Sequence, residues 1–248
     1  CFFYAIYFMR KYLLTFLLII VPLLLYAQEN RFGIKSGVAV SSMSQQETEI
    51  GNVTIDWGVV TSYQTGVFYN RRLKNSLLSF QFELDYKKLG TDFSVNDIDG
   101  RIDPSSKANY EFEHIGFSIL PRIDLFPDKK INPNFMIGGI LEFNKSSSVV
   151  FTTDIPDPDR SLENFFFGGD AKEHTEDYLF GFAMAGGIEF ATDPVIITLE
   201  GRYTSLFTPV FNEGVEELPL NGQTYIIKIM EDSRHNYLSF LIGFNFYF

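Results

Sequence analysis

The sequence has a single cysteine, Cys1, among its 248 residues. One cysteine excludes an internal disulfide and a zinc site built from cysteines. The chain is also poor in basic residues relative to acidic ones: it has 20 Lys and Arg and 31 Asp and Glu, which gives a net charge of −11. A chain without a concentrated basic patch is not expected to bind nucleic acid.

Signals for helices are missing as well. The chain shows no long helical pattern and no heptad repeat, and beyond residue 27 it has no apolar run of the ~20 residues that a membrane-spanning helix needs. Aromatic residues instead make up 17% of the chain, with 27 Phe and 13 Tyr but one Trp. Such a composition favours β-strands.

The N-terminal segment, residues 1–27, reads as an export signal. Met9 is the expected initiator and is followed by two basic residues, and residues 12–25 form an apolar run of 14 residues. This run is short for a membrane anchor, so the pattern predicts a cleaved signal peptide. The remaining domain is then expected to span residues 28–248.

Eight later segments alternate large apolar side chains with small or polar ones. They are residues 32–44, 58–70, 77–90, 109–125, 134–145, 178–191, 195–207 and 234–248. A period of two is the mark of a strand with two unlike faces.

The connections between these segments alternate in length. Three are short, at 71–76, 126–133 and 192–194, and four are long, at 45–57, 91–108, 146–177 and 208–233. An up-and-down membrane barrel has such alternation, with short periplasmic turns and long extracellular loops.

The segment 178–190 indicates which face meets lipid. One face carries Tyr178, Phe180 and other bulky residues, whereas the other carries small residues such as Ala183 and Ala185. The interior of an eight-stranded barrel barely holds its own side chains, so the bulky face is expected to point outward. The predicted fold is an all-β, eight-stranded antiparallel transmembrane β-barrel.

Charged residues on the other face of the strands are then expected in the lumen. They are Lys35, Glu83, Asp85, Lys87, Arg122, Asp124, Glu142, Glu189, Glu200 and Arg202. Charges of both signs at similar depth predict a paired network that plugs the barrel, because buried charges persist only when paired. An ion or proton pathway is the alternative.

Two loop features are candidates for contacts. The aromatic run Phe165, Phe166 and Phe167 could meet a partner or the membrane, or pack against its own loop. The carboxylates of Asp154, Asp157 and Asp159 could hold Ca²⁺, but their spacing lacks the Gly and Glu of an EF-hand. A solvated loop is favoured, and no metal or cofactor is predicted.

Catalysis is not expected. The three histidines are His114, His174 and His235. His235 follows Ser233 and His114 lies near Ser118, but their two strands are not expected to be neighbours, and a Ser-His site needs base and nucleophile within hydrogen-bond reach. No GxSxG motif occurs. The histidines are therefore predicted as rim or loop residues, and the protein as a non-enzyme.

The stretches "FGIKSGVAVSSM", "FELDYKKLG" and "LSFLIGFNFYF" resemble the PorT-like outer-membrane β-barrel family of Bacteroidetes-type bacteria. The resemblance covers residues 28–248 and implies an outer-membrane location and an eight-stranded barrel. Most members have no known activity, and one is associated with a protein secretion apparatus. Pro121 departs from the family pattern, since it lies near the end of its strand. The alternating Phe244, Phe246 and Phe248 resemble the terminal signal read by the barrel-insertion machinery.

The expected function is therefore a plugged, non-enzymatic outer-membrane barrel. It would act structurally or through its extracellular loops, in adhesion, envelope assembly or a secretion-associated role. Expected partners are outer-membrane lipid, the barrel-insertion machinery and an envelope protein. Two alternatives stay open: an outer-membrane lipid-modifying enzyme, and an exported soluble lipocalin-like barrel that binds an apolar ligand.

Overall fold

The computed structural model defines most of the chain after the N-terminal segment. The described residues are 27–44, 49–50, 53–97, 107–153, 165–170, 172, 175–211, 214–220, 223–229 and 233–247. Several sequence predictions lie outside them: the signal peptide up to residue 26, Asp154, Asp157, Asp159, His174 and Phe248.

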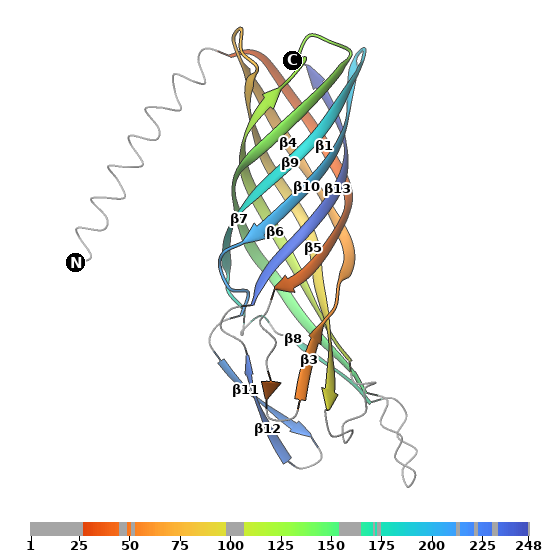
Figure 1. Ribbon diagram of the computed structural model, residues 1–248, viewed down its shortest axis with the longest axis vertical. Helices are drawn as coiled ribbons and strands as arrows, with labels where there is room; N and C mark the ends of the chain where they lie inside the picture. Colours follow the sequence, from red (N-terminus) through yellow and green to blue (C-terminus); the bar gives the residue numbers. More distant parts are fainter. Residues whose placement is uncertain are drawn as a thin grey trace, which may run out of the picture.

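Eight long strands form a closed antiparallel barrel (Figure 1). They are β1 (Ala27–Ser44), β4 (Val60–Leu73), β5 (Leu78–Asp97), β6 (Lys107–Asp124), β7 (Ile131–Thr153), β9 (Tyr178–Thr192), β10 (Val195–Leu206) and β13 (Arg234–Tyr247). Each pairs with the next, and pairing of β13 with β1 closes the ring. All eight predicted strands are confirmed. Closure pairs the backbone groups of every strand within the protein, as lipid requires.

The alternation of short and long connections is confirmed. Residues 74–77, 125–130 and 193–194 are the short turns, and they lie at the upper rim in Figure 1, where the C-terminus also lies. Asn75 in the first of these turns has a φ of 53°, a left-handed conformation that asparagine tolerates better than most residues. The four long connections all leave from the opposite rim.

The boundaries on the long-connection side were predicted wrongly. β5 and β7 run past their predicted ends, and the segments predicted as loops contain further strands. These are β2 (Glu49–Ile50), β3 (Val53–Trp57), β8 (Phe165–Asp170), β11 (Gly214–Leu220) and β12 (Gln223–Ile229). β3 pairs with β5, β8 pairs with β7, and β11 and β12 form a separate two-stranded sheet. These strands lie beyond the part of the wall in which apolar and polar residues alternate, so the alternation in the sequence does not predict them.

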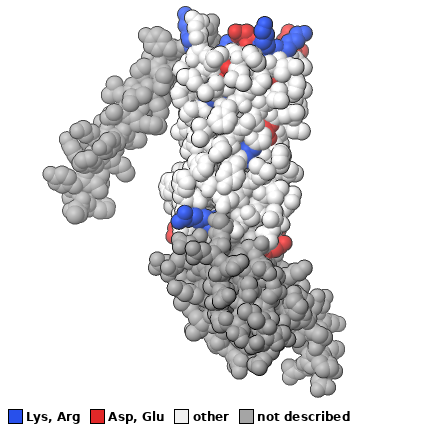
Figure 2. Space-filling view, viewed as in Figure 1, with Lys and Arg blue, Asp and Glu red and all other residues white. Residues whose placement is uncertain are grey.

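The two faces of the wall are oriented as predicted. In β5, Leu78 and Leu84 are exposed, whereas Ser79, Glu83 and Asp85 are buried. Figure 2 shows a largely uncharged outer wall, with Lys, Arg, Asp and Glu gathered at the rims. Within the described residues no helix is long and apolar enough to cross a membrane. An apolar exterior around a polar interior is the arrangement of a transmembrane barrel.

Two irregularities occur in the ladder between β6 and β7. A bulge opposite Glu113 and His114 shifts the alternation of β7, so that Asn144 and Ser147 are both buried while Lys145 is exposed. The β6–β7 ladder also skips Pro121, which has no N–H to donate. This proline, the departure from the family pattern, therefore interrupts the ladder without ending the strand.

Adjacent glycines in β7 differ sharply in their surroundings. A Cβ added to Gly138 would lie 2.0 Å from the carbonyl oxygen of Ile119, whereas a Cβ on Gly139 would meet nothing within 4 Å. Only the first position is thus closed to a side chain by the neighbouring strand.

We predict that Gly138→Ala destabilises the barrel by roughly 1–3 kcal/mol, because the new methyl group forces β6 and β7 apart. Gly139→Ala is the matched control and should stay within about 0.5 kcal/mol of the parent protein. Urea unfolding in lipid vesicles, followed by the heat-sensitive gel shift of folded barrels, measures both. Equal midpoints for the two variants would contradict the close approach.

Candidate functional site

The lumen is filled by buried charged side chains. The cations are Arg31, Lys35, Lys87, Arg122 and Arg202, and the anions are Glu83, Asp85, Asp124, Glu142, Glu189 and Glu200. All ten charges that the sequence assigned to the lumen lie there, and Arg31 was missed. Five cations face six carboxylates, so the interior is close to neutral.

The layer nearest the short turns centres on Glu189. Its Oε2 accepts a hydrogen bond from Arg31 Nη1 at 2.9 Å, and its Oε1 lies 2.6 Å from Arg122 Nη2. Arg122 also donates to Asp124 through Nε at 2.8 Å. Asn132 donates to both Asp124 and Glu189, at 2.8 and 3.1 Å. These bonds tie β1, β6, β7 and β9 together across the lumen.

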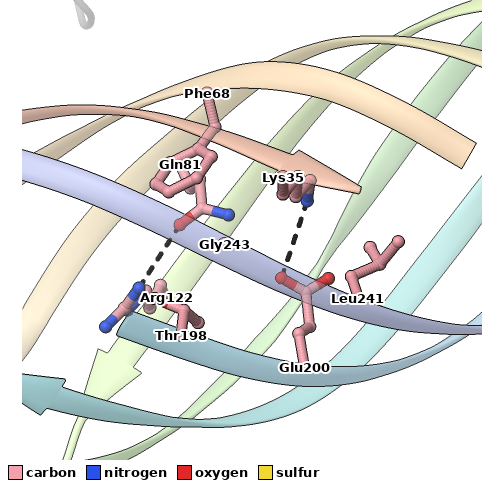
Figure 3. A pocket seen from close by; sticks show the side chains of 8 residues that line it. All are labelled: Lys35, Phe68, Gln81, Arg122, Thr198, Glu200, Leu241 and Gly243. Atoms are coloured by element: carbon pink, nitrogen blue, oxygen red, sulfur yellow. Dashed lines mark hydrogen bonds and ion pairs between the residues drawn. The ribbon is translucent and has the colours of Figure 1, made fainter. Parts of the chain in front are cut away.

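The middle layer centres on Glu83 in β5. Arg202 donates to its two oxygens in a fork, at 2.6 and 2.8 Å, and Lys35 donates to it at 2.6 Å. Gln81 adds a further bond at 2.6 Å. Glu200 lies 2.5 Å from Arg202. It also lies 3.5 Å from Lys35, and Figure 3 shows this Lys35–Glu200 contact. Paired, charge-assisted contacts of this kind are the strongest hydrogen bonds in proteins.

The third layer, toward the long connections, centres on Glu142 in β7. Its Oε1 accepts hydrogen bonds from Lys87 at 2.7 Å and from the Tyr237 hydroxyl at 2.5 Å. Its Oε2 lies 2.7 Å from His114 Nδ1. Lys87 also lies 3.0 Å from Asp85. Both oxygens of Glu142 are thus engaged.

An apolar cap closes the lumen on the long-connection side. It consists of Met43, Tyr110, Phe112, Val210 and Phe211. The ring of Phe211 packs edge-on against Tyr110 and Phe112, with centroids 5.3 and 6.0 Å apart. Its segment, residues 207–211, is held by a hydrogen bond from Val210 N to Ser233 O at 2.8 Å. The chain therefore seals this mouth with its own residues.

The predicted placement of two histidines was wrong. His114 and His235 were expected at the rim or in loops, but both are completely buried inside the barrel. Their ring centroids lie 6.2 Å apart although β6 and β13 are not neighbours. The sequence could have indicated the position of His235. Residues two apart on a strand share a face, so His235 lies on the same inward face as Tyr237 and Ser239.

A small void separates the first two layers (Figure 3). It is lined by Lys35, Gln81, Arg122 and Glu200 among others, and it has room for about one water molecule. Within the described ranges, no group of three or more His, Cys, Asp and Glu side chains is arranged to hold a metal ion.

The predicted contact residues lie on strands. Phe165, Phe166 and Phe167 were expected in a loop, but their backbone forms part of β8, opposite Phe151–Thr153 of β7. Phe244 and Phe246 lie on the outward, exposed face of β13.

A closed eight-stranded wall with an apolar exterior and an ion-paired interior defines a membrane-spanning β-barrel protein. Residues 26–212 match the family described as outer membrane protein beta-barrel domain, and the chain belongs to this family. The protein is therefore an outer-membrane protein. No curated protein matches the chain.

Several solved outer-membrane barrels are similar in structure and distant in sequence. Neisserial surface protein A matches 86% of this chain and 95% of its own, at 14% identity and a TM-score of 0.40. OprG from Pseudomonas aeruginosa matches 90% and 97%, at 10% identity and a TM-score of 0.44. Ail of Yersinia pestis matches 88% and 100%, at 11% identity and a TM-score of 0.37.

We predict that Glu83→Gln destabilises the barrel by roughly 3–5 kcal/mol, because Lys35 and Arg202 then share one buried carboxylate, that of Glu200, in place of two. Glu113→Gln is the control, since Glu113 pairs with Lys145 on the outer face at 2.8 Å. Losing that surface pair should cost about 1 kcal/mol or less. Urea unfolding in vesicles compares the two, and equal losses would contradict the central role of Glu83.

Proposed function

We propose that the protein is a non-enzymatic outer-membrane barrel with a closed lumen that acts through its extracellular side. One observation carries the proposal: three ion-paired layers and an apolar cap fill the space through which a solute would have to pass. An eight-stranded barrel has no further room for a channel.

The enzyme alternative needs a catalytic pair that faces lipid. An acid–histidine pair does occur, because His114 Nδ1 and Glu142 Oε2 lie 2.7 Å apart. Both side chains are completely buried in the lumen, however, on the opposite side of the wall from lipid. Glu142 is further occupied by Lys87 and Tyr237. The arrangement supports a structural role for this pair, as part of the plug.

The soluble alternative conflicts with the orientation of the wall. A lipocalin-like barrel would turn its bulky apolar faces inward around a ligand cavity. Here Phe135, Phe180 and Phe240 are about half exposed on the outside, and the interior holds charges. The orientation of the two faces therefore argues against a soluble barrel that carries an apolar ligand.

The segments on the long-connection side suggest the chemistry of a partner. Residues 45–57, 91–108, 146–177 and 208–233 together hold 20 acidic and five basic residues. Added strands β3 and β8 extend the wall on this side. We infer that a neighbouring envelope protein with a basic surface would be attracted there, because opposite charge favours encounter and register.

We also infer a finer assignment within the family. The strand motifs support a PorT-like, Bacteroidetes-type member, and the basic start and apolar run that follow Met9 support export by a cleaved signal peptide within residues 1–27. The alternating Phe244, Phe246 and Phe248 support recognition by the barrel-insertion machinery.

We predict that the purified protein in a planar lipid bilayer gives no steady conductance, because no water-filled path crosses the three layers. Vesicles that contain it should likewise retain small sugars. The heat-sensitive gel shift confirms folding in the same sample. A stable open-channel current from folded protein would contradict the closed lumen.

A second test concerns the loops. A photo-crosslinking residue at Tyr225 in β12 is expected to capture a neighbouring envelope protein in cells, because β12 belongs to the long connection between β10 and β13 (Figure 1). The same residue at Asp193, in a short turn, is the control. Capture of one common product at both positions, or of none at Tyr225, would argue against action through the extracellular side.

A further inference from the structure

Two histidines meet directly beneath the apolar cap. His114 projects from β6 and His235 from β13, and their ring centroids lie 6.2 Å apart across the lumen. Phe112 of the cap packs edge-on against His235, at 4.8 Å between centroids. Both imidazoles are completely buried, so neither contacts solvent while the cap is closed.

The hydrogen bonds of these rings are incomplete. His114 Nδ1 is bonded to Glu142, but its Nε2 has no partner, and neither ring nitrogen of His235 has one within the described part of the chain. A neutral imidazole always carries one N–H donor. His235 therefore buries a donor without an acceptor, which destabilises the closed state.

The surroundings offer no free carboxylate to pair with a protonated His235. The facing titratable groups are His114 and Tyr110 from β6, Glu142 from β7, Lys87 from β5 and Tyr237 from β13 itself. Glu142 is the one carboxylate of this set, and its oxygens already accept bonds from Lys87, Tyr237 and His114. The cap segment 207–211 contains no charged residue.

The cap segment is attached by backbone and hydroxyl hydrogen bonds and by a bridge between Phe211 and Thr175, whereas ion pairs hold the layers below it. The segment is held through Val210, whose N–H donates to Ser233 O at 2.8 Å and whose carbonyl accepts from Glu176 N at 2.9 Å. Phe207 and Thr208 add backbone bonds to Phe180 O. No ion pair anchors this segment within the described residues, whereas each lower layer has several.

We propose that the buried pair of His114 and His235 is an acid-sensitive latch, and that its protonation releases the cap segment 207–211 from the mouth. A positive charge on His235 needs water, and water reaches His235 only when Phe211 and its segment leave. Imidazole is the side chain whose charge changes near physiological pH. The ion-paired layers below keep the lumen closed, so the opened mouth becomes a pit and not a channel.

The test is amide hydrogen exchange of the folded protein in lipid vesicles at about pH 7.5 and about pH 5, corrected for the intrinsic rates. Protection of residues 207–211 should fall about tenfold or more at the lower pH, while protection of β10 and β9 should stay constant. Equal protection of the cap at both pH values would overturn the latch.

Variants separate the latch from general acid effects. His235→Phe keeps an aromatic ring without a titratable group, so its cap should stay protected at both pH values. His174→Gln is the control and should respond to acid as the parent does. If acid still releases the cap segment in His235→Phe, or no longer releases it in His174→Gln, the acid response does not come from the His114–His235 pair and the proposal is overturned.

A fold check accompanies each variant. Where His235→Phe fails to show the heat-sensitive gel shift, His114→Gln provides the second test, since it removes the other half of the pair. Its cap should lose most of the acid response, and an undiminished response would overturn the proposal. Bilayer conductance in the same buffers tests the closed lumen separately. A plugged barrel should pass no current at either pH, whether or not the cap segment is released.

Discussion

The structure depends on the pairing of charges across a lumen too narrow to hold water around them. Lipid on the outside forces the bulky apolar residues outward, and closure of the sheet leaves the other face of every strand inside. Charges on that face are tolerated only with partners. Glu83 shows the consequence: it joins Lys35 of β1 and Arg202 of β10 to β5. The ion pairs therefore connect strands that the backbone ladder does not connect.

This pairing divides the molecule into two functional parts. The layers around Glu189, Glu83 and Glu142 make the spanning part a closed plug. The opposite side, with β3, β8 and the acidic connecting segments, carries the variable chemistry through which the protein is proposed to act. The cap segment 207–211 lies between these parts, and three ring nitrogens of the histidine pair beneath it have no hydrogen-bond partner among the described residues.

The sequence predicted the barrel well because its signals are local. A period of two specifies a strand and assigns each side chain to a face, so Glu83 and Arg202 could both be placed in the lumen from parity alone. Contacts across the lumen depend on register and on the curvature of the closed sheet, which are not local. For this reason the fork between Arg202 and Glu83 and the meeting of His114 with His235 were not predictable. Arg31 shares the inward parity of Lys35 and was missed because the predicted strand began at residue 32. The backbone of β8 was missed because its pairing partner in β7 lies beyond the amphipathic wall.

The orientation of the wall is tested most directly by single-cysteine labelling along β7, since the parent chain has no cysteine other than Cys1. Ile137 is about half exposed on the outer face, whereas Ile140 points into the lumen and is buried. In outer-membrane vesicles, Ile137→Cys should react with a lipid-soluble thiol reagent and not with a charged one, and Ile140→Cys should react with neither. Rapid reaction of Ile137→Cys with the charged reagent would contradict a lipid-facing apolar exterior.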